Sequence, residues 1–292
     1  MDTSNYDHYS STLPRRRIAW AIRIFPLFIS GLWFGGCVRE FQEIVETYED
    51  GTPKIILTFR GRKDSLNYHQ LVLYPSGKAD HAGQIVNGKK SGTWTWWHEN
   101  GNRKAQCKFE GGRYVDTIFH WYENGQVQQV EVLPASGIRD GECCSGTTTR
   151  YWENGKVKEQ YMSMNRLLHG TYKRYYENGG WSISTYRNDS LEGPTLQHNV
   201  DSSGMVTIVV GQYRQNREVG YWQWFNKDSV LRRSVQFEDG TSPCLIKTYY
   251  PNGKTESEGT LINGKYEGYV TYYDDQGNLL GKGYFRNGNP VK

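Results

Sequence analysis

A short motif that recurs along most of the chain constrains its fold more than any other feature of the sequence. In its fullest form two aromatic residues precede Glu-Asn-Gly, as at residues 151–155 and 175–179. The turn residues of this series fall at Gly51, Gly77, Gly101, Gly125, Gly155, Gly179, Gly204, Gly253 and Gly277, with Ser229 in the one missing slot. A sequence with such a period folds as repeated units that bury their apolar surface against their neighbours.

A second series of turn signals lies between the copies of the first. Its clearest members are residues 87–88, 263–264 and 287–288, all Asn-Gly, and short runs of β-forming residues such as 93–97 and 221–225 separate the two series. Asn and Gly supply the positive φ that tight hairpin turns need. We therefore predict hairpin units of about 24 residues, in which the structural turn residues are Gly88, Gly101, Gly125, Gly155, Gly179, Gly253, Gly264 and Gly277.

The composition excludes the main alternatives to a strand-rich fold. Only 36% of the residues are hydrophobic, whereas 14% are aromatic and 33 are glycine. A helix bundle or a doubly wound α/β sheet needs far more aliphatic residues, and a disordered chain lacks aromatics. Since one hairpin cannot bury its own apolar face, we expect stacked hairpins to align one aromatic slot as the core ladder: Trp97, Trp121, Tyr151, Tyr175, Phe225, Tyr249 and Tyr273.

The repeat resembles the membrane occupation and recognition nexus (MORN) repeat, in the variant found in bacterial YwqK-type antitoxin proteins. The best copy is residues 259–273, Gly-Thr-Leu-Ile-Asn-Gly-Lys-Tyr-Glu-Gly-Tyr-Val-Thr-Tyr-Tyr, and the resemblance extends over residues 48–289. It implies an all-β fold: an elongated, twisted antiparallel sheet of about ten tandem hairpins. We assign residues 38–292 to this repeat domain.

Residues 1–37 have a different character. Arg15, Arg16 and Arg17 precede an apolar run at residues 18–36, of which the uninterrupted part, residues 24–36, has the length of a signal-peptide core. The end of this run, Phe-Gly-Gly-Cys at residues 34–37, resembles a bacterial lipoprotein signal. We expect a signal or anchor helix, lipid attachment at Cys37 and a location in the cell envelope. An uncleaved signal anchor, or a core segment of a cytoplasmic protein, are the alternatives.

Nothing in the sequence suggests an enzyme or a cofactor. We find no phosphate-binding loop, dinucleotide fingerprint or metalloprotease motif, and the cysteines form no C-x-x-C pair, so we expect no metal site. The net charge of +4 comes from interspersed residues without a basic stripe, which argues against nucleic acid. His98, His120, Cys107 and the glutamates at 123, 153 and 177 are interpreted as structural or solvated residues. The disulfide state of Cys107, Cys143, Cys144 and Cys244 stays open.

Candidate binding residues are aromatic and basic. Trp and Tyr favour protein interfaces, so Trp94, Trp96, Trp222 and Trp224 are candidates for partner contact, although one face of the sheet must also be core. Alternation along a strand places Trp94 and Trp96 on one face. Lys173 and Arg174, with Arg150, form a basic group that suits acidic partners or lipid headgroups, or else a solvated face.

These observations favour a monomeric, non-enzymatic repeat protein that binds a partner protein along its sheet. The family resemblance implies neutralisation of a toxin by direct occlusion, in an antitoxin or immunity role. Alternatives are an envelope-anchored scaffold or surface lipoprotein without a toxin partner, and a module that binds lipid headgroups.

Overall fold

The computed structural model describes residues 38–134, 138–139, 145–238 and 241–291, and within these ranges the chain forms 23 β-strands and turns but no α-helix. The anchor helix expected in residues 1–37 lies outside the described residues. The strands are β1 (Glu40–Thr47), β2 (Pro53–Arg60), β3 (Tyr68–Leu73), β4 (Ala79–Val86), β5 (Lys89–Trp97), β6 (Arg103–Glu110), β7 (Arg113–Trp121), β8 (Val127–Val132), β9 (Ile138–Arg139), β10 (Gly146–Tyr151), β11 (Val157–Met164), β12 (Leu167–Tyr175), β13 (Trp181–Arg187), β14 (Ser190–Val200), β15 (Val206–Arg214), β16 (Arg217–Asn226), β17 (Leu231–Glu238), β18 (Thr241–Tyr249), β19 (Thr255–Ile262), β20 (Lys265–Tyr266), β21 (Gly268–Tyr273), β22 (Leu279–Arg286) and β23 (Asn289–Val291).

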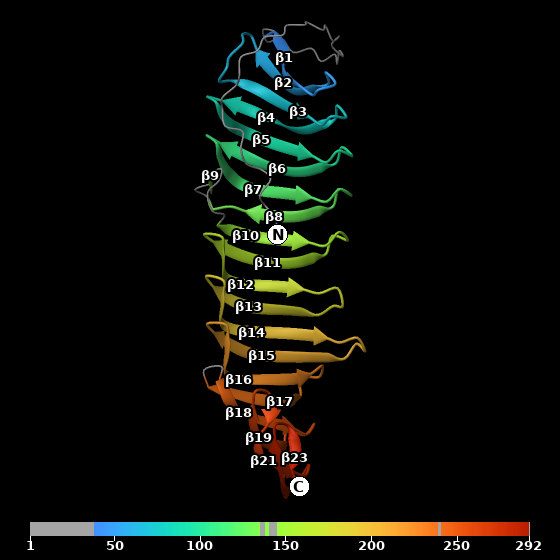
Figure 1. Ribbon diagram of the computed structural model, residues 1–292, viewed down its shortest axis with the longest axis vertical. Helices are drawn as coiled ribbons and strands as arrows, with labels where there is room; N and C mark the ends of the chain where they lie inside the picture. Colours follow the sequence, from blue (N-terminus) through green and yellow to red (C-terminus); the bar gives the residue numbers. More distant parts are fainter. Residues whose placement is uncertain (1–37, 135–137, 140–144, 239–240, 292) are drawn as a thin grey trace.

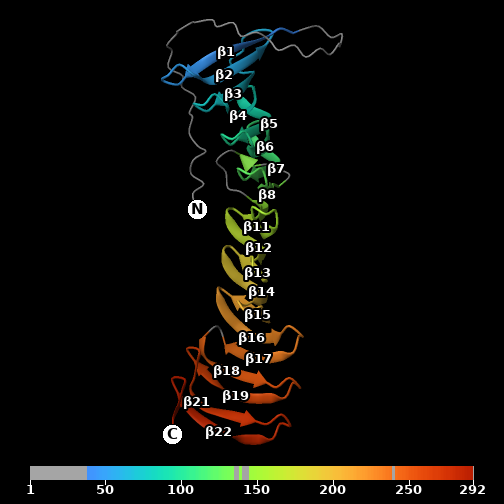
Figure 2. The ribbon, with the colours of Figure 1, turned by 90° about the vertical axis from the view of Figure 1, so that its right-hand side faces the viewer.

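The strands form one antiparallel sheet in which neighbours in sequence are neighbours in space (Figure 1). Two local exceptions occur: β8 pairs with β10 while the short β9 pairs with the start of β7, and both β20 and β21 lie against β19. The predicted all-β sheet of consecutive hairpins is therefore confirmed. The sheet is long and twisted, because the central strands are seen broadside in Figure 1 and edge-on in Figure 2, whereas the strands β18 to β22 show the reverse. A right-handed twist of this kind accumulates from the twist of individual strands.

One long edge of the sheet carries the Glu-Asn-Gly turns. Ten turns of this kind lie in the described residues, and in each the fourth residue donates its backbone N–H to the carbonyl of the first, as Gly101 does to His98 at 2.8 Å. All eight glycines named from the sequence have positive φ, from 72° at Gly88 to 94° at Gly101, and Ser229 adopts φ 60° in the slot without glycine. The motif therefore encodes the turn itself.

The asparagine of the motif has two functions. The Asn100 Oδ1 accepts a hydrogen bond of 2.9 Å from the backbone of Asn102 within its own turn, while Nδ2 donates one of 2.8 Å to the carbonyl of Glu123 in the next turn. Asn252 repeats both contacts, with Lys254 and Asp275. The side chain thus shapes one turn and joins it to its neighbour, which explains why Asn recurs beside Gly.

The opposite edge carries two-residue turns in which both central residues have positive φ, as at Asn87 (51°) and Gly88 (72°). This is the type I′ geometry that matches strand twist. The second central residue also reaches back to the preceding repeat: the N–H of Gly88 donates to the carbonyl of Leu66 and that of Gly112 to Lys90, at 2.9 and 3.0 Å. Hydrogen bonds at both edges of the sheet therefore connect successive repeats.

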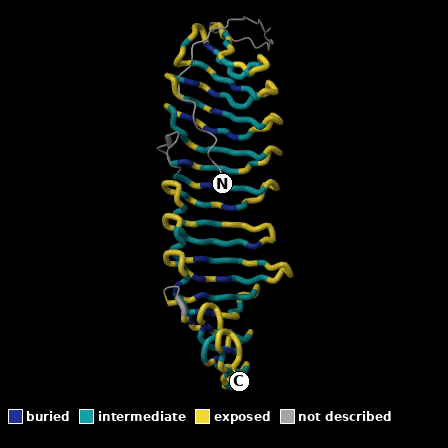
Figure 3. Tube along the Cα trace, in the orientation of Figure 1, coloured by how far each residue is buried: buried dark blue, intermediate teal, exposed yellow. Residues whose placement is uncertain are grey.

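One face of the sheet holds the largest fully buried side chains, and we call it the core face. Its buried positions include Trp94, Phe109, Trp222, Val235 and Val270, each at most 3% exposed. Figure 3 shows that buried residues lie along the middle of the strands and exposed ones at the turns. Two apolar clusters form there, around Ile85, Trp94, Cys107 and Phe109, and around Val235, Cys244, Ile246 and Leu261. Cys107 and Cys244 therefore serve as packing residues in separate clusters.

The expected aromatic ladder is wrong as to which residues form the core. Its members are partly exposed, up to 39% at Tyr175, and the buried residues come three positions earlier, as Trp94 does before Trp97. The reason is alternation along the strand: a residue three positions after a core residue, as Trp97 is after Trp94, points to the opposite face of the sheet.

The ladder residues instead accept hydrogen bonds at their backbone carbonyls from side chains of the preceding repeat. The hydroxyl of Tyr74 donates to the carbonyl of Trp97, that of Tyr122 to Tyr151 and that of Tyr250 to Tyr273, at 2.8 to 2.9 Å. His98 takes the same place with its Nε2, 3.0 Å from the carbonyl of Trp121. Each such bond is worth about 1 kcal/mol, so the second aromatic of the motif links one repeat to the next.

The two buried indoles, Trp94 and Trp222, each lie over a glycine of the neighbouring strand. A Cβ built on Gly83 would lie 2.2 Å from the ring of Trp94, and one on Gly211 would lie 2.3 Å from that of Trp222. Each ring also donates its Nε1–H to the next carbonyl, Gln84 at 3.1 Å and Gln212 at 3.3 Å. The same contact recurs 128 residues apart, since the two glycines and the two tryptophans occupy equivalent slots.

We predict that Gly83→Ala lowers the free energy of unfolding by roughly 1–3 kcal/mol, because the methyl group would displace a ring held by Cys107 and Phe109. The cost should shrink markedly in a Trp94→Val background, since valine is the natural residue opposite Gly259, as Val270. Urea unfolding of the four chains of this double-mutant cycle measures the coupling. Equal costs in both backgrounds would contradict the proposed contact.

Candidate functional site

An unbroken row of side chains runs along the core face on the side nearer the Glu-Asn-Gly turns, and we call it the core-face row. Each member is the direct cross-strand partner of the next. In order they are His81, Trp96, Ala105, His120, Gln129, Arg150, Glu159, Arg174, Ser182, Gln197, Val209, Trp224, Arg233, Thr248, Ser257, Tyr272 and Gly281. At about 4.8 Å per strand the row is roughly 75 Å long.

The row divides the four candidate tryptophans into two pairs. Trp96 and Trp224 belong to it and are partly exposed, whereas Trp94 and Trp222 are 1% and 3% exposed beneath neighbouring rings. The expectation of partner contact is therefore corrected for Trp94 and Trp222, whose indoles are core. The predicted common face is present, because the rings of Trp94 and Trp96 are 6.0 Å apart and those of Trp222 and Trp224 are 6.3 Å apart.

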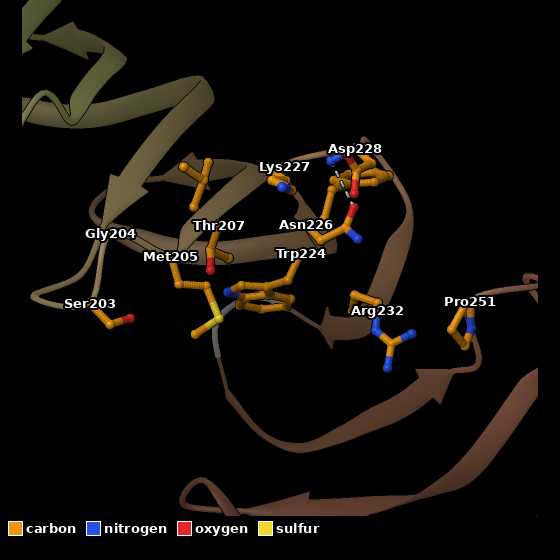
Figure 4. Close-up of a pocket in the computed structure, with 12 residues that line it drawn as sticks. Ser203, Gly204, Met205, Thr207, Trp224, Asn226, Lys227, Asp228, Arg232 and Pro251 are labelled. Atoms are coloured by element: carbon orange, nitrogen blue, oxygen red, sulfur yellow. Dashed lines mark hydrogen bonds between the residues drawn. The ribbon is translucent and has the colours of Figure 1, made fainter.

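A shallow depression of about 550 Å³ opens beside Trp224. Figure 4 shows the indole with Met205 and Arg232 on either side and Pro251 beyond. Arg233, the next member of the row, holds its guanidinium 4.7 Å from the centre of the Trp224 ring. Met205 is 64% exposed at the tip of its turn. Lys227, Arg232 and Asp228 also line the depression, which therefore combines an accessible aromatic surface with two positive groups and one carboxylate.

The middle of the row is polar instead of apolar, and we call this part the central network. Arg150 donates from Nε to Gln129 Oε1 at 2.6 Å and from Nη1 to Glu159 Oε1 at 2.8 Å, and the Tyr172 hydroxyl donates to Glu159 Oε2 at 2.5 Å. Gln129 in turn donates to Glu131, which lies 3.9 Å from His120. The network therefore connects five neighbouring strands, β7, β8, β10, β11 and β12.

Glu159 is the buried charge at the centre of this network. Burial by itself would raise its pKa, but the hydrogen bonds from Tyr172 and Arg150 and the charges of Arg150 and Arg174 outweigh burial and hold the pKa below its usual value. Burial and the bond to Glu159 raise the pKa of Tyr172 well above its ordinary range. Burial lowers the pKa of His120, which Glu131 offsets only in part. The carboxylate is thus ionised at neutral pH while the phenol and the imidazole are neutral.

The predicted basic group does not lie on one face. Arg150 and Arg174 flank Glu159 as its two cross-strand partners, whereas Lys173 alternates to the opposite face and pairs with Gln160. The Arg150 side chain is 41% exposed and that of Glu159 only 10%. Arg174 and Arg233 are exposed as well. The charge that the core-face row presents to solvent is therefore positive, carried by arginine alone.

The remaining residues singled out from the sequence are structural. Cys107 is 4% exposed in an apolar cluster, which excludes it as an accessible nucleophile. Glu123, Glu153 and Glu177 are solvated turn residues, as predicted. Within the described part of the chain no three His, Cys, Asp or Glu side chains gather as a metal site would need, and there is no helix long and apolar enough to cross a membrane. Cys37, Cys143 and Cys144 lie outside the described residues.

Sequence reasoning missed the central network and Arg233. The signal was present, because the cross-strand partners Arg150, Glu159 and Arg174 stand in slots that hold Trp96, Val209 or Trp224 elsewhere in the row. Recognising this signal requires knowing which residues pair across the strands. The bulges within the hairpins change those pairings, so they cannot be counted off from the turns.

Replacing Glu159 by Gln should destabilise the protein by about 1–2 kcal/mol at pH 7, less than for a fully buried ion pair because Arg150 is partly exposed. A carboxylate with a depressed pKa stabilises the fold above its unfolded pKa, and that contribution disappears as the pH falls through the folded pKa. The stability difference between the variant and the wild type should therefore shrink progressively as the pH falls below 4.5, the ordinary pKa of the carboxyl group. Urea unfolding between pH 7 and pH 3 tests this, with Gln160→Ala on the opposite face as the control.

Comparison with known proteins agrees with this architecture. Residues 90–110, 145–165, 168–188 and 245–263 match a family model described as MORN repeat variant. Each match covers one hairpin with its Glu-Asn-Gly or Pro-Asn-Gly turn: β5–β6, β10–β11, β12–β13 and β18–β19. No curated protein matches the chain. The chain is thus a repeat protein whose hairpins are similar, in these four places, to the MORN repeat variant.

Proposed function

We propose that this protein is a non-enzymatic binding module whose core-face row holds an acidic segment of a partner protein. The observation that carries this proposal is the pairing of an accessible indole, Trp224, with the exposed guanidinium of Arg233 in one continuous row. Trp, Tyr and Arg dominate the binding energy of protein interfaces. The exposed positive charges at Arg150, Arg174 and Arg233 favour a partner of opposite sign.

The finer proposal is that the partner is a toxin whose working surface the sheet covers, as in an antitoxin or immunity protein. The resemblance of the repeat to bacterial YwqK-type antitoxins supports this step. An open sheet of many repeats offers the length that occlusion of a folded partner needs. The alternatives of an envelope scaffold and of a module that binds lipid headgroups use the same surface with a different partner.

Trp224→Ser should weaken partner capture by at least about tenfold, as expected for truncation of a central aromatic anchor. The measurement is quantitative mass spectrometry of proteins that co-purify with the tagged full-length chain from its own host. Gln223→Ala, one residue away on the opposite face, is the control and should capture the same proteins as the wild type. Loss of capture in both variants, or in neither, would refute the proposal.

We further propose that Cys37 is lipidated and that the repeat domain is anchored in the cell envelope. The support is the sequence of residues 15–37. Mass analysis of the cellular protein should then show loss of residues 1–36 and an added acyl mass. An intact Met1 on a cytoplasmic form would exclude this anchor.

A further inference from the structure

The depression beside Trp224 opens where the repeat motif lacks one of its aromatic rings. Each of the ten turns at the Glu-Asn-Gly edge begins with a residue whose backbone N–H donates to the carbonyl four residues later, and we call it the turn-start residue. In order, the turn-start residues are Tyr48, Tyr74, His98, Tyr122, Trp152, Tyr176, Asp201, Asn226, Tyr250 and Asp274. Three of them, Asp201, Asn226 and Asp274, therefore bring no ring to the space between their own turn and the next.

In other repeats a tyrosine at this position connects its turn to the following repeat. The hydroxyl of Tyr48 donates to the carbonyl of Leu73 at 2.7 Å, and the same bond is described above for three further repeats. The acceptor is always the residue just before the next turn-start residue. For Asn226 that residue is Tyr249. We call the space at Asn226 that corresponds to the tyrosine ring of these repeats the open slot.

A basic side chain lies over the turn-start ring in two repeats. It comes six residues after the turn-start residue: Lys54 lies 5.7 Å from the centre of the Tyr48 ring, and Lys158 lies 4.2 Å from that of Trp152. Arg232 occupies the same sixth place in its own repeat and lines the depression. The open slot therefore has the cation that accompanies such a ring, but no ring from this chain.

The position of the depressions agrees with this comparison of repeats. The depression of about 550 Å³ extends over the two consecutive turns that begin at Asp201 and Asn226, with Pro251 of the next turn beyond them (Figure 4). A second depression of about 540 Å³ opens beside Asp274, where Leu280 takes the sixth place. Each depression thus includes at least one turn whose turn-start residue is not aromatic.

The Asn226 side chain itself is committed to its own turn. Its Oδ1 accepts hydrogen bonds from the backbone N–H groups of Asp228 and Val230, at 3.0 and 2.9 Å (Figure 4). Asp201 and Asp274 close their turns with the same pair of contacts. These short side chains shape one turn instead of joining two, which leaves the space between the turns to another group.

We propose that the open slot binds a tyrosine side chain of the partner protein. The ring lies against the guanidinium of Arg232, and its hydroxyl donates to the carbonyl of Tyr249, as the chain's own tyrosines do in other repeats. This inference rests on the proposed function, because it names the residue that anchors the bound acidic segment beside Trp224. Tyrosine is among the residues that dominate the binding energy of interfaces.

The test uses the full chain and p-cresol, which is the tyrosine side chain as a free molecule. Relaxation-edited NMR of the ligand should detect binding to the wild type, with a dissociation constant on the order of millimolar. The methyl ether of p-cresol keeps the ring and the oxygen but cannot donate a hydrogen bond, so it should bind roughly fivefold more weakly. A wild type that does not bind p-cresol would overturn the proposal.

Asn226→Tyr should fill the open slot with a ring of the chain itself. The turn that begins at Tyr48 accommodates this change, because Asp50, two residues later, accepts a backbone hydrogen bond of 2.8 Å within the turn, and Asp228 holds that place here. The variant should keep the wild-type melting temperature and bind p-cresol at least about tenfold more weakly. Glu177→Tyr, which adds a tyrosine to a solvated turn, is the control and should bind like the wild type. Equal affinity of Asn226→Tyr and the wild type would contradict the proposal.

Arg232→Gln decides the outcome if Asn226→Tyr fails to fold. Loss of the cation should weaken p-cresol binding roughly two- to fivefold, and an unchanged affinity counts against the proposal.

Partner capture from the host separates this inference from the proposed function. Asn226→Tyr should lose the proteins that the wild type captures. If Trp224→Ser loses them and Asn226→Tyr retains them, the core-face row binds its partner without a tyrosine in the open slot, and only this inference fails. Capture that survives Trp224→Ser refutes the proposed function and with it the partner tyrosine, even where p-cresol binds.

Discussion

A single open sheet must bury apolar surface without a second layer, and every feature of this protein follows from how it does so. The solution is a large side chain lying flat on a neighbouring strand, over a position that has none. Trp94 over Gly83 and Trp222 over Gly211 are the fullest cases, with less than 4% of either indole exposed. Because the contact joins adjacent strands, it can be copied along the chain without limit, which suits a solenoid-like repeat.

The hydrogen bonds at the two edges keep the contact between tryptophan and glycine in register. A slip of one residue would move every core residue to the outer face. The asparagine and tyrosine bonds at one edge, and the backbone bonds of the type I′ turns at the other, both connect successive repeats. Register is therefore fixed at both edges of the sheet, and the core-face row remains unbroken from β4 to β22.

Variation within this frame distinguishes the parts of the molecule. The two apolar clusters lie toward the ends of the sheet, and the central network replaces them in between, with Glu159 held ionised among Arg150, Arg174 and Tyr172. A network of this kind gives up hydrophobic stabilisation in exchange for directional bonds. It also leaves arginine at the surface. The side chains of the row thus change from apolar to charged and back, while the strand pairing stays the same.

The sequence by itself determined the all-β class, the hairpin period and nearly every turn, because the turns depend on local φ and on Asn, Asp and Gly. It could not determine which aromatic is core, since Trp94 and Trp97 are equally apolar and alternation places them on opposite faces without saying which face is buried. It also could not separate Trp222 from Trp224, which share one face and differ in how far neighbouring side chains cover them. Tertiary structure decided these points because burial and cross-strand neighbours arise only when distant strands pair, with bulges that no local signal locates.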